Sequence, residues 1–163
     1  MSDPRPHIRR VVVSAPGVDH AGGVHVDDDD ATAVVELPAV PGTALVDLWR
    51  SDVVPLDLGP TDDPTATPFA LMPTGSLFRV IDLGPTGDAE PMWHRTDSVD
   101  FIFVASGCCS LLHRDGRLDL GAGDTVVVRG VEHAWVNEGD EVCRLVDVSV
   151  AATGGPVATE EER

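Results

Sequence analysis

The sequence contains no lysine, tyrosine or glutamine, and only one asparagine, Asn137. All 11 positive charges are therefore arginine, against 28 Asp and Glu residues, and the formal net charge is -17. Proteins that bind nucleic acid need a clustered basic surface for the phosphates. This composition therefore argues against a nucleic-acid partner.

Long apolar runs are also missing. None approaches the roughly 20 residues that a transmembrane helix requires, so we expect no membrane partner. The first residues, MSDPRPHIRR, lack the apolar core of a signal peptide, and the expected location is the cytoplasm. The three cysteines form no CxxC pair, which argues against a zinc ribbon. In a reducing compartment we expect Cys108, Cys109 and Cys143 to be small buried apolar residues, although adjacent cysteines in a strand point to opposite faces.

Short segments rich in β-branched residues make up much of the chain, separated by Gly, Pro and Asp. They are residues 8–13, 31–37, 43–49, 76–83, 100–106, 109–114, 124–129, 133–137 and 141–150. Strands at roughly this spacing, with turn residues between them, predict an all-β sandwich or barrel.

The segments are not evenly dense along the chain. Residues 76–151 form a close series that predicts a barrel, whereas residues 1–75 carry strands joined by Pro-rich links. We expect the N-terminal strands to pack on the barrel rather than form an independent domain, because each is too short to bury a core. Residues 152–163 are predicted to be a disordered tail. The four acids at 27–30 are interpreted as a solvated loop.

Two stretches of the C-terminal half have a spacing typical of known motifs. The first reads His94-Arg-Thr96-(x)3-Asp100-(x)6-Gly107, and the second reads Gly123-(x)5-Arg129-Gly130-(x)2-His133-(x)3-Asn137. They resemble the two motifs of the cupin superfamily, and the first is similar to that of small single-domain bacterial cupins with an HRTDS-type motif. The resemblance implies the cupin double-stranded β-helix, a jelly-roll barrel, with extra N-terminal strands.

This sequence departs from the cupin pattern at three positions. Thr96 stands where the first motif has its second histidine, and Asp100 replaces the glutamate. Arg129 falls at the proline position, with one residue fewer before the glycine. Three strong metal ligands therefore remain where a full cupin site has four.

The resemblance implies that His94, Asp100 and His133 converge at the mouth of the barrel as catalytic residues. Two imidazoles and a carboxylate match the ligand set of non-haem iron(II) sites, and zinc, manganese or nickel could also bind to such a set. A divalent metal is thus one candidate cofactor. The chain would then be a cupin enzyme, such as an oxygenase, isomerase, cyclase or lyase, that acts on a small oxygenated organic substrate.

Two alternatives remain open. A histidine held by a carboxylate is also a general base, so the same residues support a metal-free isomerase, cyclase or dehydratase. The departures at Thr96 and Asp100 instead favour a non-catalytic ligand-binding or sensor protein. In each case we expect Thr96, Arg129 and Trp135 to contact the small molecule. We expect the exposed edges of the sheet to pair two copies of the chain into a homodimer.

Overall fold

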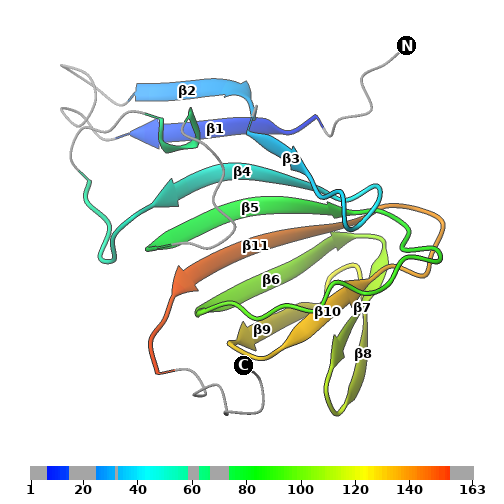
Figure 1. The fold of residues 1–163 in the computed structure, drawn as a ribbon. Coiled ribbons are helices and arrows are strands. Elements are labelled where there is room, and N and C mark those ends of the chain that lie inside the picture. The colour runs from blue at the N-terminus through cyan, green and yellow to red at the C-terminus, as the bar shows by residue number, and fades with distance from the viewer. Residues whose placement is uncertain (1–6, 15–24, 32, 59–62, 67–73, 155–163) are drawn as a thin grey trace.

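The computed structural model describes residues 7–14, 25–31, 33–58, 63–66 and 74–154, and this part of the chain is built of strands (Figure 1). The only helical element among these residues is a short 3-10 helix, η1 (Pro64–Ala66). The strands are β1 (Arg9–Ser14), β2 (His25–Asp30), β3 (Val34–Glu36), β4 (Ala44–Ser51), β5 (Ser76–Leu83), β6 (Ser98–Ser106), β7 (Cys108–His113), β8 (Gly116–Gly121), β9 (Thr125–Arg129), β10 (His133–Val136) and β11 (Cys143–Ala151). The all-β prediction is confirmed. No helix in the described part of the chain is long and apolar enough to cross a membrane.

The strands form three antiparallel sheets. The largest has the order β3-β4-β5-β11-β6-β9, the second has the order β10-β7-β8, and β1 pairs with β2. Figure 1 shows the six-stranded sheet as a curved layer, with β7, β8 and β10 gathered at one end of it. The neighbours β5 and β11, and β11 and β6, are far apart in sequence, so the centre of the sheet is held by long-range pairings typical of a jelly roll.

Two hydrophobic cores lie on opposite faces of the six-stranded sheet. The larger core fills the barrel between the sheets and contains Val40, Leu83, Ile102, Val104, Cys109, Leu111, Val128, Cys143 and Leu145. The smaller core consists of Ala31, Val46, Leu48 and Val80, with Ile8 and Val34 packed against it. The smaller core therefore joins the N-terminal strands to the outer face of β4 and β5. The predicted division at residue 76 stays a prediction.

Strand β2 was not expected from the sequence. The acids at 27–30 were predicted to form a loop, but they form the outer half of a hairpin with β1, in register from Arg9–Asp30 to Ser14–His25. Arg9 donates two hydrogen bonds to Asp28, at 2.7 and 2.6 Å, and Arg10 donates to Asp29 at 3.0 and 2.6 Å. These cross-strand ion pairs offset the low strand propensity of aspartate.

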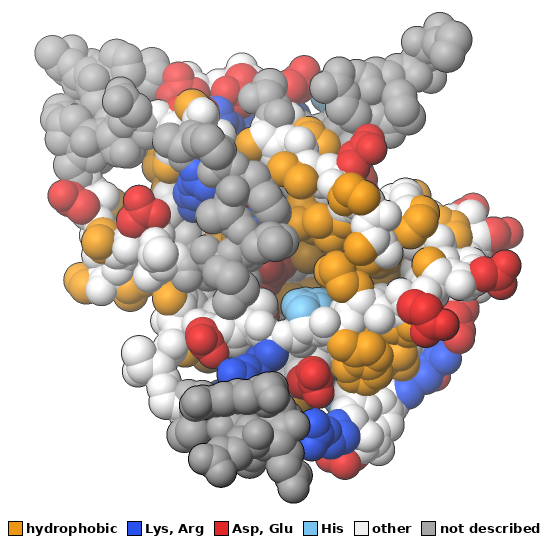
Figure 2. All heavy atoms as spheres, viewed as in Figure 1, with side chains coloured by type: hydrophobic (Ala, Val, Ile, Leu, Met, Phe, Trp, Pro, Cys, Tyr) orange, Lys and Arg blue, Asp and Glu red, His pale blue; other side chains and the backbone are white. Residues whose placement is uncertain are grey.

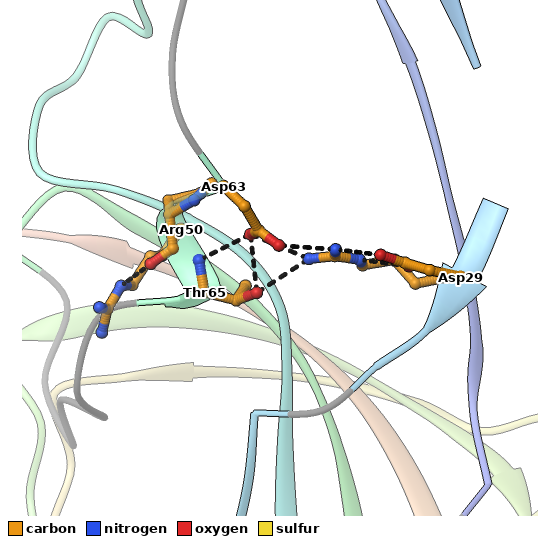
Figure 3. A network of polar contacts seen from close by, with 6 residues as sticks. Asp29, Arg50, Asp63 and Thr65 are labelled. Carbon is orange, nitrogen blue, oxygen red and sulfur yellow. Dashed lines mark hydrogen bonds and ion pairs between the residues drawn. The ribbon is translucent and has the colours of Figure 1, made fainter. Parts of the chain in front are cut away.

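Arg10 also ties the hairpin to the rest of the chain. Its guanidinium donates to Asp63 at 3.0 and 2.7 Å and to the hydroxyl of Thr65 at 2.8 Å, beside η1 (Figure 3). Arg50 on β4 donates to the carbonyl of Pro64 at 2.9 Å from the other side (Figure 3). The arginines thus connect the hairpin, η1 and β4.

The glycine and the asparagine of the two motifs have structural roles. Gly107 joins β6 to β7 with a φ of 75°, and a Cβ there would lie 2.9 Å from the Cα of Cys143. The side chain of Asn137 is fully buried, and it donates to the carbonyls of Leu83 at 2.9 Å and Glu141 at 2.8 Å. Its Oδ1 accepts from the amide of Gly139 at 2.9 Å, so all its polar atoms are used to hold the loop.

The cysteine prediction was wrong at one position. Cys109 and Cys143 are buried in the barrel core, whereas Cys108 is exposed. Neighbours in a strand point to opposite faces, so only one of the adjacent pair can reach the core. Of the predicted disordered tail, residues 155–163 lie outside the described residues.

Candidate functional site

The inner wall of the barrel is apolar at one end and polar at the other. On β11 the buried residues alternate, and Cys143 and Leu145 belong to the barrel core. Because side chains alternate between the faces of a strand, Asp147 and Ser149 also point into the barrel. On β6, Ile102 and Val104 are in the core and Asp100 shares their face. The polar end of the wall is therefore made by residues that continue the core-facing rows.

The two motif histidines meet at this polar end. His94 and His133 form an isolated β-bridge, with both backbone N–O distances at 2.9 Å. Their rings lie 4.4 Å apart between centroids, at 51° to each other. His133 is buried and His94 is half-buried. Figure 2 shows this face of the molecule hollowed near its centre, with hydrophobic side chains along the hollow and a histidine at its edge.

Both imidazoles are oriented by backbone carbonyls. Nδ1 of His94 lies 3.0 Å from the carbonyl oxygen of Met92, and Nδ1 of His133 lies 2.8 Å from that of Val131. A carbonyl oxygen can only accept, so Nδ1 carries the proton in each ring. In the neutral form, Nε2 of each ring then has a free lone pair for a proton or a ligand.

His133 is held in its neutral form. Burial lowers its pKa below the ordinary value, and the nearby His94 adds to this effect. The hydrogen bond to Val131 and the charge of Asp100 act in the opposite direction and raise the pKa less than burial lowers it. An imidazole of this kind can accept a proton at neutral pH.

Asp100 is fixed by two hydroxyl groups. Thr96 donates to its Oδ2 at 3.0 Å, and Ser98 donates to its Oδ1 at 2.6 Å. The threonine at the motif's second histidine position is thus a hydrogen-bond donor to the acid of the same motif. Asp100 is 6% exposed, so these bonds replace water around a buried carboxylate.

The three predicted metal ligands do not come together as a metal site. In the part of the chain that the structure describes, no three His, Cys, Asp or Glu side chains form a group able to hold a metal ion. Each oxygen of Asp100 accepts one hydroxyl hydrogen bond, from Thr96 or from Ser98. The described residues thus assemble no three-ligand centre, and a divalent metal at His94, Asp100 and His133 stays a prediction.

The predicted substrate-binding residues lie in different places. Trp135 stands edge-on to His133, with centroids 6.1 Å apart, and packs against the barrel core. Arg129 is exposed, because its neighbour Val128 takes the inward position opposite Asp100. Arg129 therefore points away from the inner wall.

Three charged residues of the inner wall were missed by the sequence reasoning. Asp47, Arg79 and Asp147 are 2, 5 and 6% exposed and stand in register across β4, β5 and β11. Arg79 donates to Asp47 at 3.0 Å in a buried ion pair. The available signal was strand alternation, since Arg79 and Asp147 occupy positions that the period of two assigns to the core side.

Comparison with known proteins gives a match over the same part of the chain. Residues 79–149 match the family model described as the cupin domain. The oryzines biosynthesis cluster protein J of Aspergillus oryzae is 42% identical over 71 residues, which are 43% of this chain and 38% of that protein. The phomopsin biosynthesis cluster protein D of Diaporthe leptostromiformis is 36% identical over 87 residues, 52% of this chain and 45% of that protein. The chain thus spans less than half the length of these relatives.

A solved structure supports the fold over more of the chain. A protein designated ethanolamine utilization protein Q from Salmonella typhimurium aligns with 91% of this chain and 100% of its own, at 10% identity and a TM-score of 0.55. At this identity the likeness concerns the fold alone. The family match, the paired motifs and the jelly-roll arrangement agree, and they identify residues 79–149 as a cupin domain.

Proposed function

We propose that this protein binds a small oxygenated organic molecule in the cupin barrel and moves a proton on it, as an isomerase, cyclase or dehydratase does. The observation that carries the proposal is the orientation of the two histidines. Each uses Nδ1 on a backbone carbonyl, which leaves Nε2 as the proton acceptor. Of the alternatives open from the sequence, this is the metal-free one, favoured because the three motif residues do not form a metal-binding group among the described residues.

His133 is the proposed general base. Its lowered pKa keeps it neutral, so Nε2 can take a proton from an acidic C–H or an O–H of the bound molecule. The resulting imidazolium would be stabilised by the charge of Asp100, and the proton would return to another atom of the same molecule or leave with water. His94 stands beside it with the same tautomer and is the proposed second acid or base.

The matched relatives support a biosynthetic substrate. Both are named as proteins of biosynthesis clusters, for oryzines and for phomopsin. For this chain we therefore propose a substrate from a biosynthetic pathway of small organic compounds.

Proton transfer can be tested without the final product. Candidate carbonyl compounds are incubated with the protein in D2O, and incorporation of deuterium at carbon is followed by NMR. We expect exchange with the wild type and loss of exchange in His133→Gln. The control His7→Gln should exchange like the wild type, because His7 is exposed and contacts Asp30 on β2. Binding without any exchange would contradict catalysis and leave the ligand-binding alternative.

A further inference from the structure

A row of charges crosses the inner wall at the polar end of the barrel. Asp47, Arg79 and Asp147 are direct neighbours on β4, β5 and β11. Arg79 directs Nε and Nη2 to Oδ1 of Asp47, at 3.0 and 2.9 Å. Neighbouring strands lie about 4.8 Å apart, so Arg79 stands between two carboxylates and donates to the one on β4.

Asp147 is left with an unused acceptor. Its Oδ2 accepts the hydroxyl of Ser149 at 2.8 Å. Its Oδ1 is buried and has no hydrogen-bond partner among the described residues. Buried polar atoms are nearly always paired, because an unpaired one forfeits its bonds to water. An oxygen left in this state on the core-facing side of β11 is suited to accept a hydrogen bond from a donor that a ligand brings.

The surrounding charges decide which ligand groups are acceptable. Asp147 and Asp100 lie on adjacent strands of the same wall, and the charge of Asp100 raises the pKa of Asp147. Three buried carboxylates, of Asp47, Asp100 and Asp147, lie on this wall together with one buried guanidinium, that of Arg79, which is paired with Asp47. The local charge is thus negative, which repels an anionic group and attracts a hydrogen-bond donor.

We propose that Asp147 is a ligand-recognition residue of this barrel, and that it accepts a hydroxyl or ammonium group of a neutral or cationic small molecule. The inference rests on the proposed function, since it names the substrate class of the same interior site. It assigns the polar contact to β11, on the wall that faces the histidines, and it disfavours phosphorylated or carboxylated ligands at this point.

The titration of Asp147 agrees with this role. Burial, and then the charge of Asp100, raises its pKa to about 6, which outweighs the hydrogen bond from Ser149 and the attraction of Arg79. Above this pH the ligand-free protein holds a carboxylate in a site that favours the neutral form. A donor from a ligand would relieve that unfavourable state.

The first test measures the stability of the ligand-free protein at pH 8. Asp147→Asn keeps the shape and removes the charge, so we expect its Tm to rise by about 3 °C or more. The matched control is Asp47→Asn, which leaves the buried Arg79 without its carboxylate and should lower the Tm. Circular dichroism checks that both variants fold. A lower Tm for Asp147→Asn would assign Asp147 a purely structural role and overturn the proposal.

The second test measures the ligand class. Thermal shifts are recorded with erythritol, ribose, ethanolamine and agmatine as neutral or cationic probes, and with ribose 5-phosphate and citrate as anionic ones. We expect the stabilising probes to come from the first group and their affinity to fall about tenfold or more in Asp147→Asn. Three outcomes would overturn the proposed class of neutral or cationic ligands. They are stabilisation by the anionic probes alone, an unchanged probe affinity in Asp147→Asn, and the absence of any stabilising probe in the first group.

His133→Gln separates this inference from the proposed function. If proton transfer is wrong but the ligand class is right, the probe shifts persist and depend on Asp147, while no deuterium exchange occurs even in the wild type. If the ligand class is wrong, deuterium exchange can still be lost in His133→Gln, while the thermal shifts caused by the probes are the same in Asp147→Asn as in the wild type.

Discussion

His94 and His133 face each other across a β-bridge in which each backbone amide donates to the carbonyl of the other residue. The bridge brings together two motif positions that are 39 residues apart in sequence, and it places the rings 4.4 Å apart between centroids. Two protonated imidazoles at this distance would repel each other. In line with this, the nearby His94 contributes to the lowered pKa of His133.

The lowered pKa of His133 predicts a pH dependence of stability. The unfolded chain takes up a proton on this residue near pH 6.5, whereas the folded chain does so only at lower pH. The unfolded state thus binds more protons between these values, and folding stability falls as the pH drops below about 6.5. His94, Asp100 and Trp135 are the neighbours that act on this ring or contact it.

The measurement is the Tm of the wild type and of His133→Gln between pH 8 and pH 5. We expect the difference in Tm, wild type minus variant, to become less favourable to the wild type as the pH falls. His7→Gln should track the wild type. A difference that does not change with pH would show that His133 titrates normally.

We expect replacement of Asn137 to lower the stability of the protein without abolishing deuterium exchange. Asn137→Ala removes the bonds to Leu83, Glu141 and Gly139, and at about 1 kcal/mol for each hydrogen bond the free energy of unfolding should fall by about 3 kcal/mol. Chemical denaturation measures this change, with Asp140→Ala in the same loop as an exposed control. Loss of deuterium exchange in folded Asn137→Ala, at a temperature where it is intact, would contradict a purely structural role.

Metal removal is expected to leave the protein unchanged. Because the described residues assemble no group of three His, Cys, Asp or Glu side chains able to hold a metal ion, we expect that dialysis against a chelator alters neither the Tm nor deuterium exchange. Elemental analysis of protein purified without a metal-affinity tag provides the second readout. Stoichiometric iron, zinc, manganese or nickel that is lost in His133→Ala would contradict the metal-free proposal.

The outer face of the six-stranded sheet predicts self-association. Phe78, Val148, Phe101 and Val127 are direct neighbours across β5, β11, β6 and β9, and they are 40, 38, 50 and 55% exposed. A continuous apolar row of this kind is typical of a protein interface. We therefore propose a homodimer that packs face to face on this row, rather than through the sheet edges expected from the sequence.

Light scattering after size exclusion tests the assembly. We expect a dimer for the wild type and a monomer for Phe101→Glu, which places a charge in the centre of the row. Val53→Glu is the control, because Val53 is 55% exposed but lies outside the sheet. A monomeric wild type at micromolar concentration would rule out the homodimer.

The strands that carry the site could be read from the sequence because their local pattern agrees with their final environment. The segment predicted at 76–83 is β5 with the same bounds, and the segment predicted at 109–114 differs from β7 (Cys108–His113) by one residue at each end. The motif spacing also singled out His94 and His133, whose proximity the structure shows. Strand β2 was missed because its stability comes from the arginines of β1, and local propensity does not include a partner strand.

The sequence by itself determined the fold class, the cupin motifs and the two histidines, since each depends on residue type and short-range spacing. Only the tertiary structure decided what surrounds them. Strand register places Arg79 beside Asp147, 68 residues later in the chain, and the alternation of side chains turns both inward and Arg129 outward. Register is set by pairing across the whole sheet, so the charge that a ligand meets inside the barrel is a property of the assembled sheet and not of any one motif.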